Sequence, residues 1–249
     1  MNDPAPAPHA PDWDAETYHR VSEPQFEWGR KVLARLPLRG DETVMDAGCG
    51  TGRLTALLLE RLPRGRVLAV DQSATMLAAA RERLHEHFPG RVEFLATDLL
   101  TLDLERCCDA IFSTATFHWV PDHDQLFVRL FRALRPGGRL VAQCGGGENL
   151  RRLHQRARAL AGAPALAPHF VGWREPWVFA DPEGTARRLR AAGFIDVETG
   201  LEAAPTRFAD AAAFRTFIAR VVLHFMVARI PESGLSEGFL DALVHHTAG

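Results

Sequence analysis

The sequence has almost no lysine, few cysteines and no long apolar run. Lys31 is the only lysine, and we attribute this arginine preference to coding bias. The formal net charge is -2 and the sequence pI is ≈ 6.6, so no basic field predicts a nucleic-acid partner or a membrane surface. No run is long enough to span a bilayer. Residues 1–12 are rich in Pro and Ala and lack the apolar core of a signal peptide, so we expect a disordered tail.

The cysteines predict neither a metal site nor a disulfide framework. Cys107 and Cys108 are adjacent, and neighbouring cysteines rarely bridge, while none of the four has zinc-ligand spacing. We therefore expect no metal and a reducing, cytoplasmic location. At 249 residues with 47% hydrophobic content, the chain suits one domain with a sizeable core, either as a monomer or as a homodimer.

Strands alternate with helices through the first half of the chain. This rhythm predicts an α/β fold with a doubly wound, mostly parallel, Rossmann-like sheet and helices on both faces. An N-terminal lid helix would occupy 13–40, and the core 41–147. The predicted strands are 42–48, 66–71, 91–98, 109–120 and 139–146, with a turn at 135–138 and helices at 13–36, 54–62, 73–87 and 122–134.

The rhythm changes after Gly147. Residues 148–180 begin with an amphipathic helix and continue as a Pro- and aromatic-rich segment, which predicts an inserted helical cap. The remaining part, 181–249, would complete the core and add helices. Its predicted elements are a helix at 182–192, a strand-like stretch at 194–208, and helices at 210–229 and 236–246.

Three aspartates lie at the carboxyl ends of the first three predicted strands. In an open parallel sheet, ligands bind in the crevice outside those ends, so these residues indicate what is bound there. Asp46 precedes the glycines of "VMDAGCGTG" and would repel the pyrophosphate of a dinucleotide, whereas it favours a sulfonium nucleoside that carries an ammonium group. Asp71 follows about twenty residues later, where a carboxylate accepts hydrogen bonds from ribose hydroxyls. Asp98 ends the third strand and is suited to an adenine amine.

The segments "VMDAGCGTG", "VLAVDQSATML", "FLATDL" and "LRPGGRL" resemble the motifs of class I S-adenosylmethionine-dependent methyltransferases in order and spacing, over roughly residues 42–146. The resemblance implies S-adenosylmethionine as cofactor. It implies that the methionine half lies against the glycine turn, the ribose on Asp71 and the adenine beside Gln72, Met76 and Asp98. The cofactor-binding residues implied are Tyr18, Gln25, Asp46, Gly48, Cys49, Gly50, Gly52, Asp71, Gln72, Met76, Thr97, Asp98, Leu99, Thr114 and Ala115.

The flanking segments are similar to the trans-aconitate and malonyl-carrier-protein carboxyl methyltransferase group. That similarity implies transfer of a methyl group to a carboxylate oxygen of a small organic or acyl acid, free or carried on a protein. A carboxylate is ionised at neutral pH and needs no general base. Methylation of carbon or nitrogen in an apolar metabolite is an alternative, and so is a non-catalytic protein that binds S-adenosylmethionine.

His118 follows the fourth predicted strand and is the candidate catalytic residue. It would act as a base near the working pH or, for a carboxylate acceptor, would orient it; alternatively it hydrogen-bonds backbone or packs beside Trp119. Tyr18, Gln25 and Trp28 share one helical face. This face would close over the cofactor or pack on the core.

Aromatic residues of the cap and the fourth strand suggest an acceptor pocket. Trp173 and Trp177 flank Arg174, which would give apolar walls with one anion-binding fork; alternatively, the tryptophans attach the cap to the sheet. The candidate pocket residues are Trp28, Phe117, Trp119, Trp173, Arg174 and Trp177. The arginines of the 148–160 helix either dock an acidic carrier protein or form a solvated face.

The sequence departs from the family pattern near its end. Class I methyltransferases finish with a hairpin whose last strand is antiparallel to the others. Residues 194–208 can supply the first strand of that hairpin, but the pattern after Asp210 is helical, and a final strand is not evident. Its loss would leave an unpaired sheet edge near the acceptor.

Overall fold

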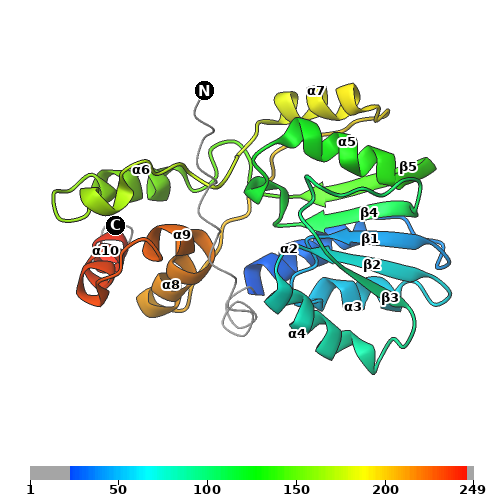
Figure 1. Ribbon diagram of the computed structural model, residues 1–249, viewed down its shortest axis with the longest axis horizontal. Coiled ribbons are helices and arrows are strands. Elements are labelled where there is room, and N and C mark those ends of the chain that lie inside the picture. The colour runs from blue at the N-terminus through cyan, green and yellow to red at the C-terminus, as the bar shows by residue number, and fades with distance from the viewer. Residues whose placement is uncertain (1–22, 246–249) are drawn as a thin grey trace.

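The computed structural model describes residues 23–245, and a five-stranded sheet forms its centre (Figure 1). All its strands are parallel, in the order β3-β2-β1-β4-β5, so the order reverses between β1 and β4. This confirms the predicted doubly wound α/β fold. The strands are β1 (Thr43–Ala47), β2 (Arg66–Asp71), β3 (Val92–Ala96), β4 (Cys108–Thr114) and β5 (Leu134–Gln143).

The central strands are apolar on both faces because helices cover both sides of the sheet. Val44 and Phe112 are fully buried against one helical layer, and Met45 and Ile111, one position away, are fully buried against the other. Side chains alternate along a strand, so consecutive residues serve the two cores. The first layer contains α2 (Glu23–Ala34), α3 (Arg53–Glu60) and α4 (Ala74–His85), and the second contains α5 (His123–Ala133) and α7 (Pro182–Ala192).

Local capping sets the ends of several helices. The hydroxyl of Ser73 accepts a hydrogen bond from the Met76 amide at 3.1 Å, as predicted for the start of α4. The carboxylate of Asp122 accepts one from the Gln125 amide at 2.9 Å and starts α5 in the same way. Helix α7 ends at Gly193, whose φ of 111° is left-handed and favours glycine.

Two predictions near the sheet are wrong in detail. The strand predicted over 109–120 ends at Thr114, because Ala115 has a φ of 53° and the chain then turns into the 3₁₀ helix η1 (Phe117–Trp119). The turn predicted at 135–138 lies inside β5. The pairing of β4 with β5 is irregular there, with a register shift between Cys108 and Ala110.

The strand-like stretch 194–208 is irregular in the structure, so it supplies no strand of a terminal hairpin. Asp196 has a φ of 51°, a left-handed conformation that interrupts an extended segment. Within residues 23–245 the sheet therefore ends at β5, and no antiparallel strand follows.

A second lobe lies to one side of the sheet, at the left of Figure 1. The helix α6 of the predicted cap packs there against helices from beyond residue 210, and all share one apolar core that includes Leu153, Ile218 and Leu240. The helix predicted over 210–229 is broken by a π-helical turn. The elements are α6 (Arg151–Ala161), η2 (Ala167–Phe170), α8 (Ala211–Phe217), η3 (Ile218–Val222), α9 (His224–Val227) and α10 (Ser233–His245).

Candidate active site

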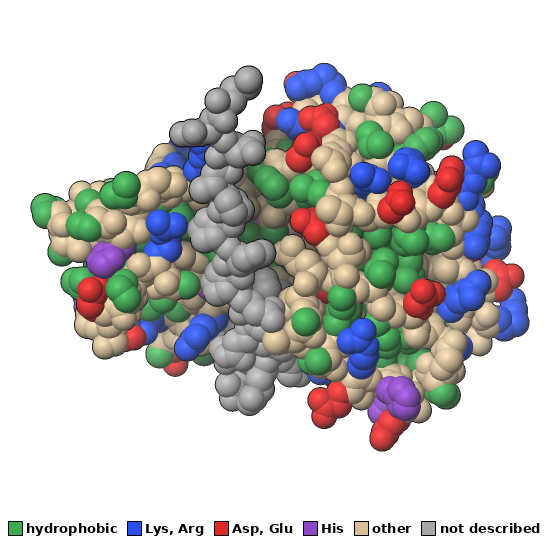
Figure 2. Space-filling view, in the orientation of Figure 1, with side chains coloured by type: hydrophobic (Ala, Val, Ile, Leu, Met, Phe, Trp, Pro, Cys, Tyr) green, Lys and Arg blue, Asp and Glu red, His purple; other side chains and the backbone are tan. Residues whose placement is uncertain are grey.

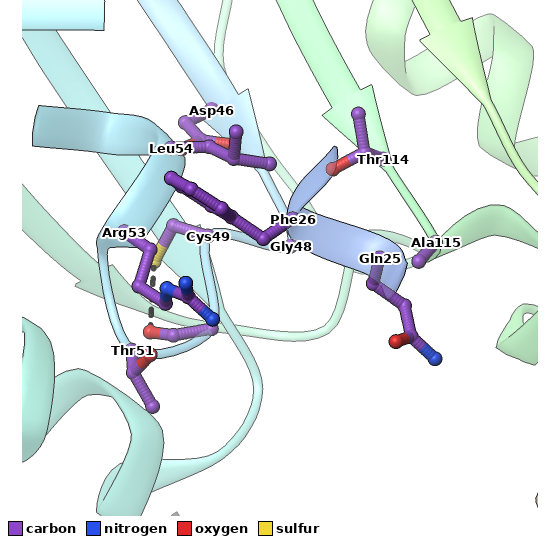
Figure 3. A pocket seen from close by; sticks show the side chains of 11 residues that line it. Gln25, Phe26, Asp46, Gly48, Cys49, Thr51, Arg53, Leu54, Thr114 and Ala115 are labelled. Carbon is purple, nitrogen blue, oxygen red and sulfur yellow. Dashed lines mark hydrogen bonds between the residues drawn. The ribbon is translucent and has the colours of Figure 1, made fainter. Parts of the chain in front are cut away.

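A cleft opens at the carboxyl ends of β1 and β4, where the strand order reverses and ligands bind in open α/β sheets. The glycine turn, the start of α3 and the start of α2 surround it (Figure 3). The lining residues are Gln25, Phe26, Asp46, Gly48, Cys49, Gly50, Thr51, Arg53, Leu54, Thr114 and Ala115.

The glycine turn needs glycine for both conformation and space. Gly48, Gly50 and Gly52 have φ values of 85°, 53° and 77°. A Cβ on Gly48 would lie 2.1 Å from the hydroxyl of Thr116, whereas a Cβ on Gly50 would meet nothing within 4 Å. The turn therefore packs tightly through Gly48 and presents open backbone to the cleft at Gly50.

Asp46 is the buried acid of the cleft. Its side chain is 2% exposed and accepts a hydrogen bond from the Thr55 hydroxyl at 2.7 Å. Burial, with a smaller contribution from the charge of Asp71, raises the pKa of Asp46 to about 7, although the Thr55 hydrogen bond opposes the rise. A cation placed beside Asp46 would favour the ionised form.

Asp71 ties the glycine turn to the start of α4. One of its carboxylate oxygens accepts from the Gly50 amide and the other from the Ser73 amide, both at 2.9 Å. The amides of Gly48 and Cys49 donate to the carbonyl of the preceding β2 residue, Val70, at 2.8 and 3.0 Å. The ends of β1 and β2 are thus fixed relative to each other before any ligand binds.

The structure brings together only part of the predicted cofactor site. Gln25, Asp46, Gly48, Cys49, Gly50, Thr114 and Ala115 line the cleft. Outside that lining are Gly52, Asp71, Gln72, Met76, Thr97, Asp98 and Leu99. Leu99 is buried in the apolar core between the sheet and α5. Asp98 is exposed, and its carboxylate accepts a hydrogen bond from the Leu100 amide of the same loop at 2.9 Å. Tyr18 lies outside the described residues.

Sequence reasoning missed Arg53, which enters the cleft from the first position of α3. Its Nη2 donates to Glu23 at 2.7 Å, and its guanidinium carbon lies 3.9 Å from the centroid of the Phe26 ring. The side chain is 19% exposed, and the buried Nη1 has no hydrogen-bond partner among residues 23–245. The signal available in the sequence was an arginine placed directly after the last glycine of the turn.

His118 lies on η1, just beyond the cleft residue Ala115. Its Nδ1 accepts a hydrogen bond from the Gly145 amide at 3.2 Å, so the neutral ring carries its proton on Nε2. Burial, with smaller contributions from His123 and His154, lowers the pKa of His118 to about 3. The expectation that this histidine titrates near the working pH is therefore wrong.

The predicted acceptor residues are dispersed. Phe117 is buried in the sheet core, where its ring lies 6.1 Å from that of Phe127. Trp28 is partly buried on α2 and does not line the cleft. Trp119 packs edge-on to Trp177 at 6.3 Å, in the second lobe.

A groove in the second lobe contains one residue of the predicted acceptor pocket, Trp177. Of the other predicted pocket residues, neither Trp173 nor the exposed Arg174 lines this groove. Trp173 instead packs on Phe170 at 6.0 Å. The lining residues are Gly147, Glu148, Asn149, Arg151, His154, Arg158, Glu175, Trp177 and Phe179.

The groove is close to His118. Phe179 connects the groove to His118, because its ring centroid lies 5.8 Å from that of His118 and 5.4 Å from that of the groove residue His154. His154 is 3% exposed, burial lowers its pKa to about 4, and neither ring nitrogen has a hydrogen-bond partner in the described part of the chain. Two guanidinium groups, an imidazole and two aromatic walls thus border one groove.

Two further searches of residues 23–245 gave negative results. No group of three or more His, Cys, Asp or Glu side chains within that range is arranged to hold a metal ion. No helix in the same range is both long and apolar enough to cross a membrane.

Comparisons with known proteins agree with this geometry. A methyltransferase-domain family matches residues 44–138. A trans-aconitate 2-methyltransferase of Variovorax paradoxus (strain S110) is 34% identical over 236 residues, which cover 88% of this chain and 83% of that protein. The enzyme of the same name from Azoarcus sp. (strain BH72) is 41% identical, but the match covers 64% of this chain and 63% of that protein.

Among solved structures, Haemonchus contortus phosphoethanolamine N-methyltransferase 2 in complex with S-adenosyl-L-methionine is similar in fold. The TM-score is 0.62 at 20% sequence identity, and the match covers 94% of this chain and 53% of that one.

Proposed function

Because this chain belongs to the family of class I S-adenosylmethionine-dependent methyltransferases that includes the trans-aconitate 2-methyltransferases, we propose that it methylates a carboxylate oxygen of a small organic acid. Its cofactor is S-adenosylmethionine. The observation that carries the choice of acceptor is the match to a relative named for trans-aconitate across 88% of this chain. Methylation of carbon or nitrogen has no comparable support.

The cleft fits the charges of S-adenosylmethionine. A buried carboxyl at Asp46 favours a cation, and the cofactor carries an ammonium and a sulfonium but no phosphate. The open backbone at Gly50 leaves room for close approach of the methionine half. We assign Asp71 to the ribose hydroxyls, and Gln72, Met76, Thr97, Asp98 and Leu99 to the adenine side.

The reaction requires alignment more than acid–base chemistry. S-adenosylmethionine supplies an electrophilic methyl group; the bond that forms joins it to a carboxylate oxygen, and the bond that breaks is to sulfur. Since the acceptor is already ionised, no proton need be removed. The protein's task is to hold the oxygen in line and exclude water.

In this proposal His118 positions the acceptor. With a pKa of about 3 the ring is neutral at physiological pH, and the proton on Nε2 is available to donate to a carboxylate. We place the remaining carboxylates of the acceptor in the groove behind Phe179, where Arg151, Arg158 and His154 offer donors. Arg151 and Arg158 already pair with Glu148 and Glu175, which hold the guanidiniums in position.

Two narrower points belong to the same proposal. The acid is used free rather than on a carrier protein, because the relative that matches 88% of this chain is named for a free acid, trans-aconitate. All four cysteines are free thiols, which suits a cytoplasmic enzyme.

The test is methyl transfer from methyl-labelled S-adenosylmethionine to trans-aconitate, to simpler di- and tricarboxylic acids, and to a carrier-bound acyl acid. We expect S-adenosylhomocysteine to form together with a methyl ester that releases labelled methanol in alkali. A base-stable product would mean transfer to carbon or nitrogen. Tight cofactor binding without turnover on any acceptor would indicate a non-catalytic binding protein.

A further inference from the structure

Two thiols that are adjacent in the sequence lie against one acceptor in the structure. The Sγ atoms of Cys107 and Cys108 are 3.5 and 3.4 Å from the same carbonyl oxygen, that of Ala133 at the end of α5. Successive side chains of a regular strand point to opposite faces of the sheet, so neighbouring residues of a strand do not meet in this way. A local departure from strand geometry therefore brings the two thiols to one side.

That departure consists of a left-handed residue and an irregular strand pairing. Arg106 has a φ of 45°, a conformation that is uncommon outside glycine. The strand β4 begins at Cys108, and its register with β5 shifts between Cys108 and Ala110. The amide of Cys107 donates to the Ala133 carbonyl at 2.9 Å, which fixes the backbone there. The fold itself thus holds the two thiols together.

The two thiols differ in their access to solvent. Cys108 is fully buried in the core, whereas Cys107 is partly exposed. Both lie at the amino end of β4, about 20 Å from the cleft residue Thr114 at its carboxyl end. The amino ends of the strands face the right of Figure 1, and Figure 2 shows arginine, aspartate and glutamate side chains mixed over that edge. A small polar molecule can therefore reach Cys107 without entering the cleft.

The groups around Cys107 favour its thiolate. A hydrogen bond from the Cys108 thiol lowers the pKa of Cys107 from an ordinary 9.0 to about 7. The amide of Cys107 and the charge of Arg135 act in the same direction, while partial burial and Glu93 oppose them. The same hydrogen bond, burial and the charge of Asp109 raise the pKa of Cys108, which keeps its proton. Arg135 is held beside the pair by its ion pair with Asp109 at 2.8 Å.

We infer that Cys107 is a modification site that undergoes reversible thiol–disulfide exchange with a low-molecular-weight disulfide, and that Cys108 is its positioning residue. The sulfur of Cys107 attacks one sulfur of the small disulfide, a new S–S bond forms as the old one breaks, and the leaving thiolate takes a proton from water. Cys107 is oxidised to a mixed disulfide, and the other half of the reagent leaves reduced, as a thiol. The buried, protonated Cys108 does not attack the mixed disulfide in turn, so the adduct persists until another thiol removes it.

The site is tested by incubating the whole chain with glutathione disulfide at pH 7, followed by mass spectrometry of the intact protein and of its peptides. We expect a single glutathione on Cys107 that dithiothreitol removes, and none on Cys107→Ser. Cys144→Ser is the matched control and should react as the wild type does, because burial raises the pKa of Cys144 to about 11. A wild type that stays unmodified while a free cysteine peptide reacts would overturn the inference, and so would equal labelling of Cys144.

The pH dependence of the exchange rate tests Cys108. The rate should rise with a midpoint near pH 7 in the wild type, and the midpoint should move toward 9.0 in Cys108→Ala, because the hydrogen bond that stabilises the thiolate is lost. Cys108→Ser keeps a donor and should hold the midpoint closer to that of the wild type. Equal midpoints for the wild type and Cys108→Ala would refute the positioning role.

Two results on the wild type alone would also count against the inference. A midpoint near 9.0 would mean that Cys108 does not stabilise the thiolate, and this measurement needs no variant. A disulfide between Cys107 and Cys108 with no glutathione retained would mean that Cys108 attacks the adduct. Because the readout is thiol chemistry at the amino end of β4, none of these outcomes depends on methyl transfer.

Discussion

The substitution Asp46→Asn should make the protein more stable at alkaline pH. The folded chain holds this carboxyl at a pKa of about 7 against an ordinary value of 3.8, because the group is buried. Each pKa unit is equivalent to about 1.4 kcal/mol, so ionised Asp46 costs the folded state about 4 kcal/mol. Asparagine has a similar shape, keeps an acceptor for the Thr55 hydroxyl and carries no charge.

The sign follows from proton binding. Between pH 4 and pH 7 the unfolded chain has released the Asp46 proton and the folded chain still holds it, so the free energy of unfolding of the wild type falls as the pH rises, and this loss levels off above pH 7. The asparagine variant lacks this loss. The stability difference between the variant and the wild type should therefore grow by about 3 kcal/mol from pH 5 to pH 8.

Urea unfolding of both proteins at pH 5 and pH 8 measures this growth, since the other titrating groups are shared and cancel in the difference. Asp41→Asn is the control, because it makes the same chemical change at a side chain that is 53% exposed rather than buried. A difference for Asp46→Asn that stays constant between the two pH values would refute the burial argument. We also expect Asp46→Asn to bind S-adenosylhomocysteine more weakly than the wild type does. That result would mean that the buried carboxylate lowers the stability of the free protein but strengthens cofactor binding.

Three other perturbations follow from the same geometry. Asp71→Ala should reduce the affinity for S-adenosylhomocysteine at least tenfold in calorimetry, because it removes the proposed ribose ligand and leaves the Gly50 amide without its acceptor. An unchanged affinity would mean that Asp71 does not bind the cofactor. His118→Asn should slow methyl transfer less than tenfold, and the pH–rate profile of the wild type should show no inflection from His118 between pH 5 and pH 9, because the pKa of about 3 lies below that range. A bell-shaped profile in the wild type that is lost in the variant would contradict this expectation. In thermal unfolding, Gly48→Ala should lower the stability by about 1–3 kcal/mol more than Gly50→Ala does, because only the former places a Cβ 2.1 Å from the Thr116 hydroxyl. Equal losses of stability would mean that backbone conformation alone determines the effect.

The core of the fold was predictable because its signals are local. The apolar runs that form β1, β2 and β4 are buried on both faces, so they stand out from composition alone. The cap at Ser73 and the glycine turn likewise depend on neighbours only a few residues away. Where the local pattern was ambiguous, as in 109–120 and 194–208, left-handed residues such as Ala115 and Asp196 changed the outcome.

The site was only partly predictable because lining a cleft depends on side-chain direction and on distant packing. Asp98 and Leu99 follow the expected strand, but one side chain caps its own loop and the other enters the core. Arg53 enters the cleft because Glu23 and Phe26, which lie on another helix, hold its guanidinium. The groove beside His118 likewise depends on contacts between α6 and the extended segment that contains Trp177 and Phe179.

The sequence by itself determined the parallel sheet, the reversal of strand order that creates a crevice, and the acidic glycine turn that favours a sulfonium nucleoside. These follow from short-range periodicity and from the backbone freedom of glycine. Only the tertiary structure decided that α6 shares a core with helices beyond residue 210, that His118 is held neutral, and that Gln25 and Arg53 line the same cleft. Burial and pairing between residues far apart in the chain set those properties, and no local pattern encodes them.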